Sequence, residues 1–206
     1  MSNINVLKRD GTQEQLNLEK VHKMVEFACE GLAGVSESQV EIQSQLQFCD
    51  GIKSSDIQEI LIRSASDLIS EEHPNYQYVA ARLLLFGLRK AVHGHPEILP
   101  PLLEHVKGCI DKGVYDAAIV NRYSEEEWDR INSFVEHERD YLFTYAGLRQ
   151  VVDKYLVQDR STGKHYESPQ QMYIMIAATL FANYPTETRL DYVRRYYNAI
   201  SKHKIN

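Results

Sequence analysis

The sequence predicts a mainly α-helical protein of the α+β class, with one β-hairpin at its N-terminus. Two short runs, Asn5–Arg9 and Thr12–Leu16, flank Asp10-Gly11, a dipeptide typical of tight hairpin turns. Beyond the hairpin, apolar residues recur mainly at the spacing of three or four residues that a helix requires. Capping residues and proline or glycine breaks divide this pattern into separate helices.

Four helices are expected in the first half of the chain. The first three starts are marked by a residue whose side chain can accept a hydrogen bond from a free backbone N–H group of the first turn, and the fourth follows a break at His73-Pro74. The starts are Asn17, then Ser36 or Ser38, then Ser54 or Ser55 after a turn at residues 50–53, and finally Asn75, from which a helix runs to Val92.

The best boundary in the sequence is HGHPEILPP at residues 93–101, where three prolines and a glycine interrupt the helical pattern. We therefore expect one domain over residues 1–95 and another over 96–206. The second domain is again helical, with a small hairpin around residues 161–163. Its expected helices are Leu102–Lys112, one opened by a capping box at Ser124–Glu127 with Trp128, Ile131 and Phe134 buried, Asp140–Val157, Ser168–Tyr184, and a last one carrying Leu190–Ile200.

Composition narrows the classes of function. The net charge of −6 argues against a general nucleic-acid-binding surface, and no apolar run approaches the roughly 20 residues of a membrane span. The N-terminus lacks a signal-peptide core. The three cysteines form no CxxC pair, which excludes a zinc ribbon, and we expect each to be a small buried residue in a reducing cytoplasm. No metal site and no catalytic residues are predicted.

Cations gather at the start of this acidic chain. Lys8 and Arg9 precede the hairpin turn, while Lys20 and Lys23 follow in the first helix. The N-terminus of that helix, near Asn17, adds free N–H groups and a positive dipole end, which together suit phosphate groups. The alternative explanation is a hairpin whose lysine and arginine side chains only face solvent and bind no ligand. Lys90 and Ser54 also have purely structural interpretations. A lysine at position 90 would stabilise the C-terminus of its helix, and a serine at position 54 would cap the N-terminus of the helix expected to begin there.

Several stretches resemble a known family. VLKRDGTQEQLNLEKV, DGIKSSDIQEILIRSASDLIS and NYQYVAARLLLFGLRK, in that order, are similar to an ATP-cone, the nucleotide-sensing module of many ribonucleotide reductase large subunits. KYLVQDRSTGKHYESPQQMYIMIAATLFANYP and TRLDYVRRYYNAISKHKI resemble the helical segment that precedes the ten-stranded catalytic barrel in class I enzymes, particularly the bacterial class Ia type. The resemblance covers essentially the whole chain.

The resemblance implies an allosteric role. ATP would activate and dATP would inhibit reduction of ribonucleotides to deoxyribonucleotides for DNA synthesis, with Mg²⁺ accompanying the triphosphate. The expected partners are the rest of the large subunit with its barrel, the radical-generating small subunit, and further copies in a homo-oligomer. The positions that match the family's nucleotide site are Lys8, Arg9, Glu14, Gln15, Leu16, Asn17, Leu18, Glu19, Lys20, Ser54, Gln58 and Lys90.

Two of these positions and the cysteines depart from the family. Ser54 stands where relatives often have threonine, and Gln58 where some have histidine, which leaves inhibition by dATP less secure than binding. None of the three cysteines lies in a context like that of the barrel's catalytic cysteines, so the resemblance implies the N-terminal part of the enzyme, ending where the barrel begins. A stand-alone ATP-cone regulator and a helical interaction module with inert cations are the alternatives.

Overall fold

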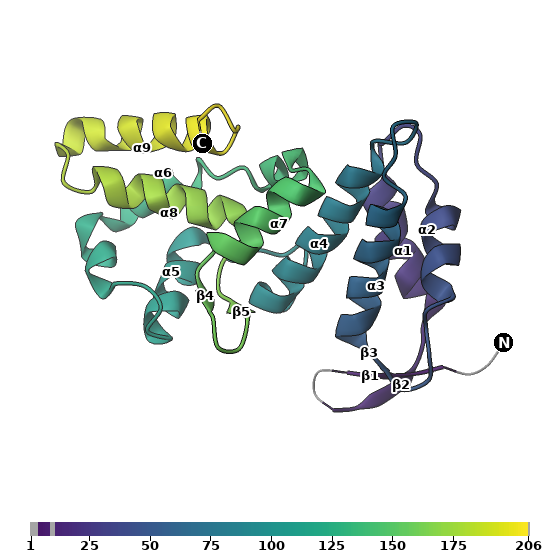
Figure 1. The fold of residues 1–206 in the computed structure, drawn as a ribbon. Helices are drawn as coiled ribbons and strands as arrows, with labels where there is room; N and C mark the ends of the chain where they lie inside the picture. The colour runs from purple at the N-terminus through teal and green to yellow at the C-terminus, as the bar shows by residue number, and fades with distance from the viewer. Residues whose placement is uncertain (1–3, 9–10, 206) are drawn as a thin grey trace. The chain divides into compact units, whose positions relative to one another are not determined.

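The computed structural model describes residues 4–8 and 11–205. Its backbone packs into two compact units. The first unit comprises Met1–Gly87 with Phe143–Arg149, and the second comprises Leu88–Leu142 with Gln150–Asn206. The sequence-based division at residue 95 stays a proposal. Mainly α-helical architecture with one N-terminal hairpin is confirmed (Figure 1).

The first unit combines a small sheet with helices. Strand β1 is the centre of a three-stranded sheet in the order β2-β1-β3, pairing antiparallel with β2 and parallel with β3 (Figure 1). Helices α1, α2 and α3 pack in sequence order, α1 on α2 and α2 on α3. The elements are β1 (Asn5–Leu7), β2 (Gln13–Gln15), α1 (Leu18–Cys29), α2 (Glu37–Gln45), β3 (Ile52–Lys53), α3 (Ser54–Asp67) and α4 (Tyr76–His93), of which residues 76–87 belong to this unit.

Apolar faces of the helices and β1 form the core of the first unit. Val25, Val40, Leu61 and Leu83 are all fully buried there. Polar side chains close the helix ends at the edge of this core. Arg82 donates from Nη1 to the carbonyl oxygen of Ala28 at 3.2 Å and to that of Glu30 at 2.6 Å, so it satisfies carbonyls at the C-terminal end of α1 that no helical N–H reaches.

The second unit consists of short helices and one two-stranded hairpin. Helices α8 and α9 pack closely side by side, and α6 contacts both α5 and α9 (Figure 1). Its elements are the end of α4, α5 (Leu102–Asp111), η1 (Ala117–Arg122), α6 (Glu125–Asn132), η2 (His137–Leu142), the end of α7 (Tyr145–Lys154), β4 (Gln158–Asp159), β5 (Lys164–His165), α8 (Pro169–Phe181) and α9 (Thr186–Ile200).

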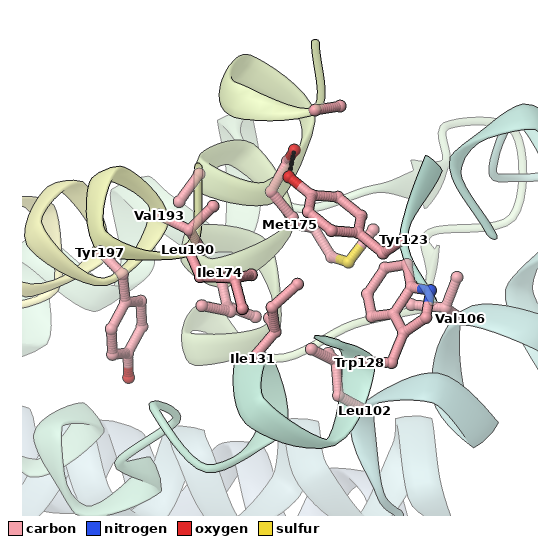
Figure 2. Close-up of a cluster of buried hydrophobic side chains, with 13 residues drawn as sticks. Leu102, Val106, Tyr123, Trp128, Ile131, Ile174, Met175, Leu190, Val193 and Tyr197 are labelled. Atoms are coloured by element: carbon pink, nitrogen blue, oxygen red, sulfur yellow. Dashed lines mark hydrogen bonds between the residues drawn. The ribbon is translucent and has the colours of Figure 1, made fainter. Parts of the chain in front are cut away.

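A cluster of buried apolar side chains holds the second unit together. Figure 2 shows Trp128 beside Tyr123, with Ile131 and Ile174 completing the contact between α6 and α8. The rings of Trp128 and Tyr123 meet edge to face at a centroid distance of 5.5 Å. The Tyr123 hydroxyl donates to the carbonyl oxygen of Ala178 at 2.7 Å, so the only polar atom on that ring is satisfied within the core.

A buried polar network lies beside this cluster. Arg89 Nη2 donates to Asp140 Oδ2 at 2.8 Å, and Gln170 Nε2 donates to the other carboxylate oxygen at 2.9 Å. The Tyr197 hydroxyl then donates to Gln170 Oε1 at 2.6 Å and accepts from the backbone N–H of Glu136 at 3.0 Å. Asp140, Gln170 and Tyr197 are at most 1% exposed. The network therefore joins α4, η2, α8 and α9 without reaching water.

The structure corrects several sequence-based expectations. The predicted helix Asp140–Val157 is wrong, because η2 ends at Leu142 and α7 begins only at Tyr145. Thr144 causes the break, since its side chain accepts from the N–H of Gly147 at 3.3 Å and so favours a new helix start. Cys49 is exposed, which contradicts the expectation that every cysteine is buried. The strand β3 and the 3₁₀ helix η1 were not predicted.

The capping box at the start of α6 is confirmed, and it gives a first testable prediction. The Ser124 hydroxyl accepts from the N–H of Glu127 at 3.3 Å, and the Ser124 N–H donates to Glu127 Oε2 at 2.8 Å. Replacing Ser124 by alanine should lower the free energy of unfolding by about 1 kcal/mol, because an N–H of the first turn loses its partner. Urea unfolding measures this change. Ser124→Thr keeps a hydroxyl and should stay close to wild type, so equal losses in both variants would contradict the capping explanation.

Candidate functional site

Three charged side chains of the first unit converge beside the hairpin. Lys8, directly after β1, places its Nζ 2.7 Å from Glu14 Oε2 on β2. Lys20, in the first turn of α1, places its Nζ 3.8 Å from Glu14 Oε1. The antiparallel register explains the contact, since Glu14 lies opposite Val6, two residues before Lys8 and on the same face of the strand. Two of the predicted site cations therefore gather around one carboxylate.

The N-terminus of α1 lies within the same cluster. Asn17 has an extended backbone and its Oδ1 accepts from the N–H of Lys20 at 3.1 Å, which confirms the predicted N-cap. The backbone N–H of Leu16 donates to the carbonyl oxygen of Ile4 at 2.8 Å, so the hairpin continues almost to the helix. The positive end of the α1 dipole thus lies within the first turn that carries Lys20.

Ser54 follows β3 at the same end at which Lys8 follows β1. The two strands are parallel, with Leu7 opposite Lys53, so the next residue of each strand emerges at one edge of the sheet. Ser54 begins α3, and the expectation that it caps this helix is wrong because the N-cap is Lys53. The side chain of Lys53 makes no capping hydrogen bond. The first turn of α3, with its free backbone N–H groups, therefore begins at the same end of the strands as Lys8.

A side chain outside the predicted set holds this edge in place. Asp50 Oδ1 accepts from both the backbone N–H and the Nδ2 of Asn5, at 2.8 Å and 2.9 Å. These hydrogen bonds lower the pKa of Asp50. The Gly51 N–H donates to the Asn5 carbonyl oxygen at 2.9 Å, and Gly51 has a φ of +78°, which favours glycine. The Asp-Gly pair at 50–51, interpreted from sequence as a turn, aligns β3 with β1.

Gln58, one turn further along α3, is directed toward α4. Its Nε2 donates to the carbonyl oxygen of Leu83 at 2.7 Å. A Cβ atom on Gly87 would lie 3.0 Å from Gln58 Cγ, so the Gln58 side chain lies directly against Gly87 of α4. Gln58 thus connects α3 to α4 in the first unit.

The structure does not bring the remaining predicted site residues into the cluster around Glu14. Gln15, Leu18 and Glu19 are exposed, and Glu19 pairs with Lys23 at 3.0 Å along α1. Arg9 lies outside the described residues. Lys90 is exposed in the last turn of α4, among the residues of the second unit, and its part in the site stays a prediction.

The donors at this edge suit an anion with several negative charges. Two lysines, a hydroxyl and the N-termini of two helices offer hydrogen-bond donors and positive potential. The described residues contain no group of three or more histidine, cysteine or acidic side chains that could hold a metal ion.

Comparison with known proteins identifies the chain. Residues 4–91 match the ATP cone domain family, and residues 141–206 match the family described as ribonucleotide reductase, all-alpha domain. The ribonucleoside-diphosphate reductase subunit alpha of Haemophilus influenzae is 52% identical over 98% of the chain. The chain belongs to the ribonucleoside-diphosphate reductase alpha-subunit family. It represents the portion of that subunit with the ATP cone and the all-alpha domain.

Alpha subunits from other organisms are also similar to this chain over nearly its whole length. The ribonucleoside-diphosphate reductase 1 subunit alpha of Escherichia coli is 51% identical over 99% of the chain, and the subunit alpha of Enterobacteria phage T4 is 40% identical over 100%. The chain spans about a quarter of the length of these alpha subunits, 26% of the Haemophilus protein and 27% of the other two. Within the described part of the chain, no helix is both long and apolar enough to cross a membrane.

Proposed function

We propose that the ATP cone of this chain binds ATP and dATP as opposing effectors of ribonucleotide reduction. The observation that carries the proposal is the gathering of Lys8 and Lys20 around Glu14, with Ser54 following β3 at the end of the sheet at which Lys8 follows β1. A nucleoside triphosphate carries about four negative charges and needs such donors, and membership of the alpha-subunit family supports a regulatory role for them.

ATP and dATP differ only by the 2′-hydroxyl group. A sensor can separate their effects only if each nucleotide favours a different conformation, because a ligand shifts an equilibrium by its difference in affinity for the two states. In the proposal the readout is assembly with the rest of the large subunit, with a radical-generating small subunit and with further copies. Mg²⁺ enters with the triphosphate.

The proposal is tested by isothermal titration of the full chain with MgATP and with MgdATP. Saturable binding of both is expected, and no heat from either at millimolar nucleotide would reject the proposal. Lys8→Ala should weaken binding of both nucleotides about tenfold or more, since a hydrogen bond to a charged group contributes about 1.5 to 3 kcal/mol. Lys23→Ala is the matched control, because Lys23 is an exposed lysine of the same unit that pairs with Glu19. Equal affinities in both variants would place the phosphates elsewhere.

A further inference from the structure

Helix α8 of the second unit carries no charged side chain. Its inner side contributes Ile174, Ala177 and Ala178 to the buried cluster of Figure 2. A helix at a protein surface normally places charged residues on its outer side, whereas a helix that is apolar all round is normally buried. The other α-helices described in this unit, α5, α6, α7 and α9, each carry several charged residues. The outer side of α8 is therefore unusual for a surface in contact with water.

Large apolar side chains occupy that outer side. Ile176 and Leu180 are 40% and 53% exposed and lie one turn apart on α8. The N–H of Tyr184 donates to the carbonyl oxygen of Phe181 at 3.1 Å, so the chain makes a further turn that carries the exposed Tyr184 ring. The ring of Tyr192 on α9, also exposed, lies 5.1 Å from it between centroids. We call Ile176, Leu180, Tyr184 and Tyr192 the α8 surface.

The aromatic part of the α8 surface is held in a fixed arrangement. The Phe181 ring stacks on Tyr192 at a centroid distance of 5.5 Å and meets Tyr184 edge to face at 5.1 Å. Phe181 itself packs against the buried cluster. Rings that are already held by neighbours lose little conformational freedom when a partner covers them. The guanidinium of Arg195 lies 5.9 Å from the centroid of Tyr192, so a charged side chain borders the surface on α9. An apolar centre with a charged border is the usual composition of a protein interface.

Single exposed apolar residues are ordinary, but a group of them on one charge-free helix marks a contact surface. We infer that the α8 surface is covered by the remaining part of a ribonucleoside-diphosphate reductase alpha subunit. The chain spans 26% of the Haemophilus influenzae subunit, so roughly three quarters of such a subunit lie outside the matched part.

The absence of charge from α8 favours this partner over a second copy of the chain or a separate subunit. Permanent interfaces resemble a protein core divided in two, whereas interfaces that form and separate carry more polar groups. A contact within one polypeptide is permanent, and it can therefore use a surface that would be a liability on a protein that dissociates. The inference goes beyond nucleotide binding and needs only membership of the alpha-subunit family.

The test compares the isolated chain with a chimera in which this chain replaces the matching quarter of the Haemophilus influenzae alpha subunit. Leu180→Cys is introduced into both proteins, and its reaction with a maleimide is followed by mass spectrometry of the peptide that contains it. The labelling rate in the chimera should be about tenfold lower or more, because a covered thiol reacts only when the contact opens. Ile176→Cys should behave in the same way. No nucleotide is added, so the result is independent of the proposed function.

The matched control is Ile98→Cys. Ile98 is an apolar residue of the same unit, 69% exposed and outside the α8 surface, and its labelling rate should be the same in both proteins. Cys109, buried in this unit, should stay unlabelled in both and so reports that the unit is folded. Equal labelling rates of Leu180→Cys in the two proteins would overturn the inference. Slow labelling already in the isolated chain, together with a doubled mass by light scattering, would identify a second copy as the partner and would also overturn it.

Discussion

Replacing Asp140 by asparagine is expected to lower the free energy of unfolding by about 3 to 5 kcal/mol. Asp140 is 1% exposed and accepts hydrogen bonds from Arg89 at 2.8 Å and from Gln170 at 2.9 Å. Asparagine nearly preserves the volume but removes the negative charge. The guanidinium of Arg89, itself 5% exposed, is then buried without a counter-charge, and arginine cannot release its proton. Urea unfolding followed by circular dichroism measures the loss.

An exposed aspartate of the same unit is the control for this substitution. Asp191 on α9 pairs with Arg194 at 3.2 Å and with Arg195 at 3.7 Å, and all three side chains are more than half exposed. Asp191→Asn should change the free energy of unfolding by at most about 1 kcal/mol. Similar losses of unfolding free energy in the two variants would show that the burial of Asp140 does not explain the effect of its replacement.

Arg89→Met should be less damaging than Asp140→Asn. Burial raises the pKa of Asp140, with Arg89 acting in the opposite direction, so without the arginine the carboxyl group can take up a proton and become neutral. The folded-state pKa then lies above the unfolded value of about 3.9. The penalty is absent below the unfolded pKa and grows as the pH rises toward the folded one. Stability of Arg89→Met that does not fall with pH in this direction would contradict the assignment.

Replacing Trp128 by alanine should cost about 3 to 5 kcal/mol. The indole is 1% exposed, lies edge to face with Tyr123, and donates from Nε1 to the carbonyl oxygen of Val120 at 3.3 Å. Its removal leaves a cavity in the cluster of buried apolar side chains and breaks the hydrogen bond to η1. Circular dichroism during urea unfolding measures the change, because helix content does not depend on the indole itself.

The control for this cavity is Leu180→Ala. Leu180 lies on α8 in the same unit but is 53% exposed, so its truncation removes little buried surface and should cost well under about 1 kcal/mol. A small loss in Trp128→Ala, equal to that of Leu180→Ala, would mean that the neighbouring side chains collapse into the space and that the cluster is not closely packed.

Features that depend on a few neighbouring residues could be predicted from the sequence. Asn17 and Ser124 cap helices because each side chain reaches an N–H three residues ahead, a contact that the chain makes with itself. Strand β3 could not be predicted, because its two residues become a strand only by pairing with Val6 and Leu7, far away in the sequence. For the same reason the local sequence predicts a cap at Ser54, although the pairing of β3 makes Lys53 the N-cap.

In the candidate site, too, some features could be predicted from the sequence and others depend on the fold. The cations Lys8 and Lys20 stand out in an acidic sequence, and the family resemblance added Glu14 and Ser54 to them. The sequence does not indicate that Glu14 lies between the two lysines, since the contact arises from the hairpin register and the position of α1. Nor does it indicate that Gln58 donates to Leu83, because that bond depends on how the fold places the Gln58 side chain against α4, 25 residues further along the chain.

Trp128 is the only tryptophan in the sequence, and it lies in the core of the second unit. Intrinsic indole fluorescence will therefore report on the second unit. Urea curves that follow this emission would record the unfolding of that unit even if the ATP cone unfolded separately. The β2-β1-β3 sheet belongs to the first unit, so the same emission, followed as MgATP is added, would show whether nucleotide binding in one unit affects the other.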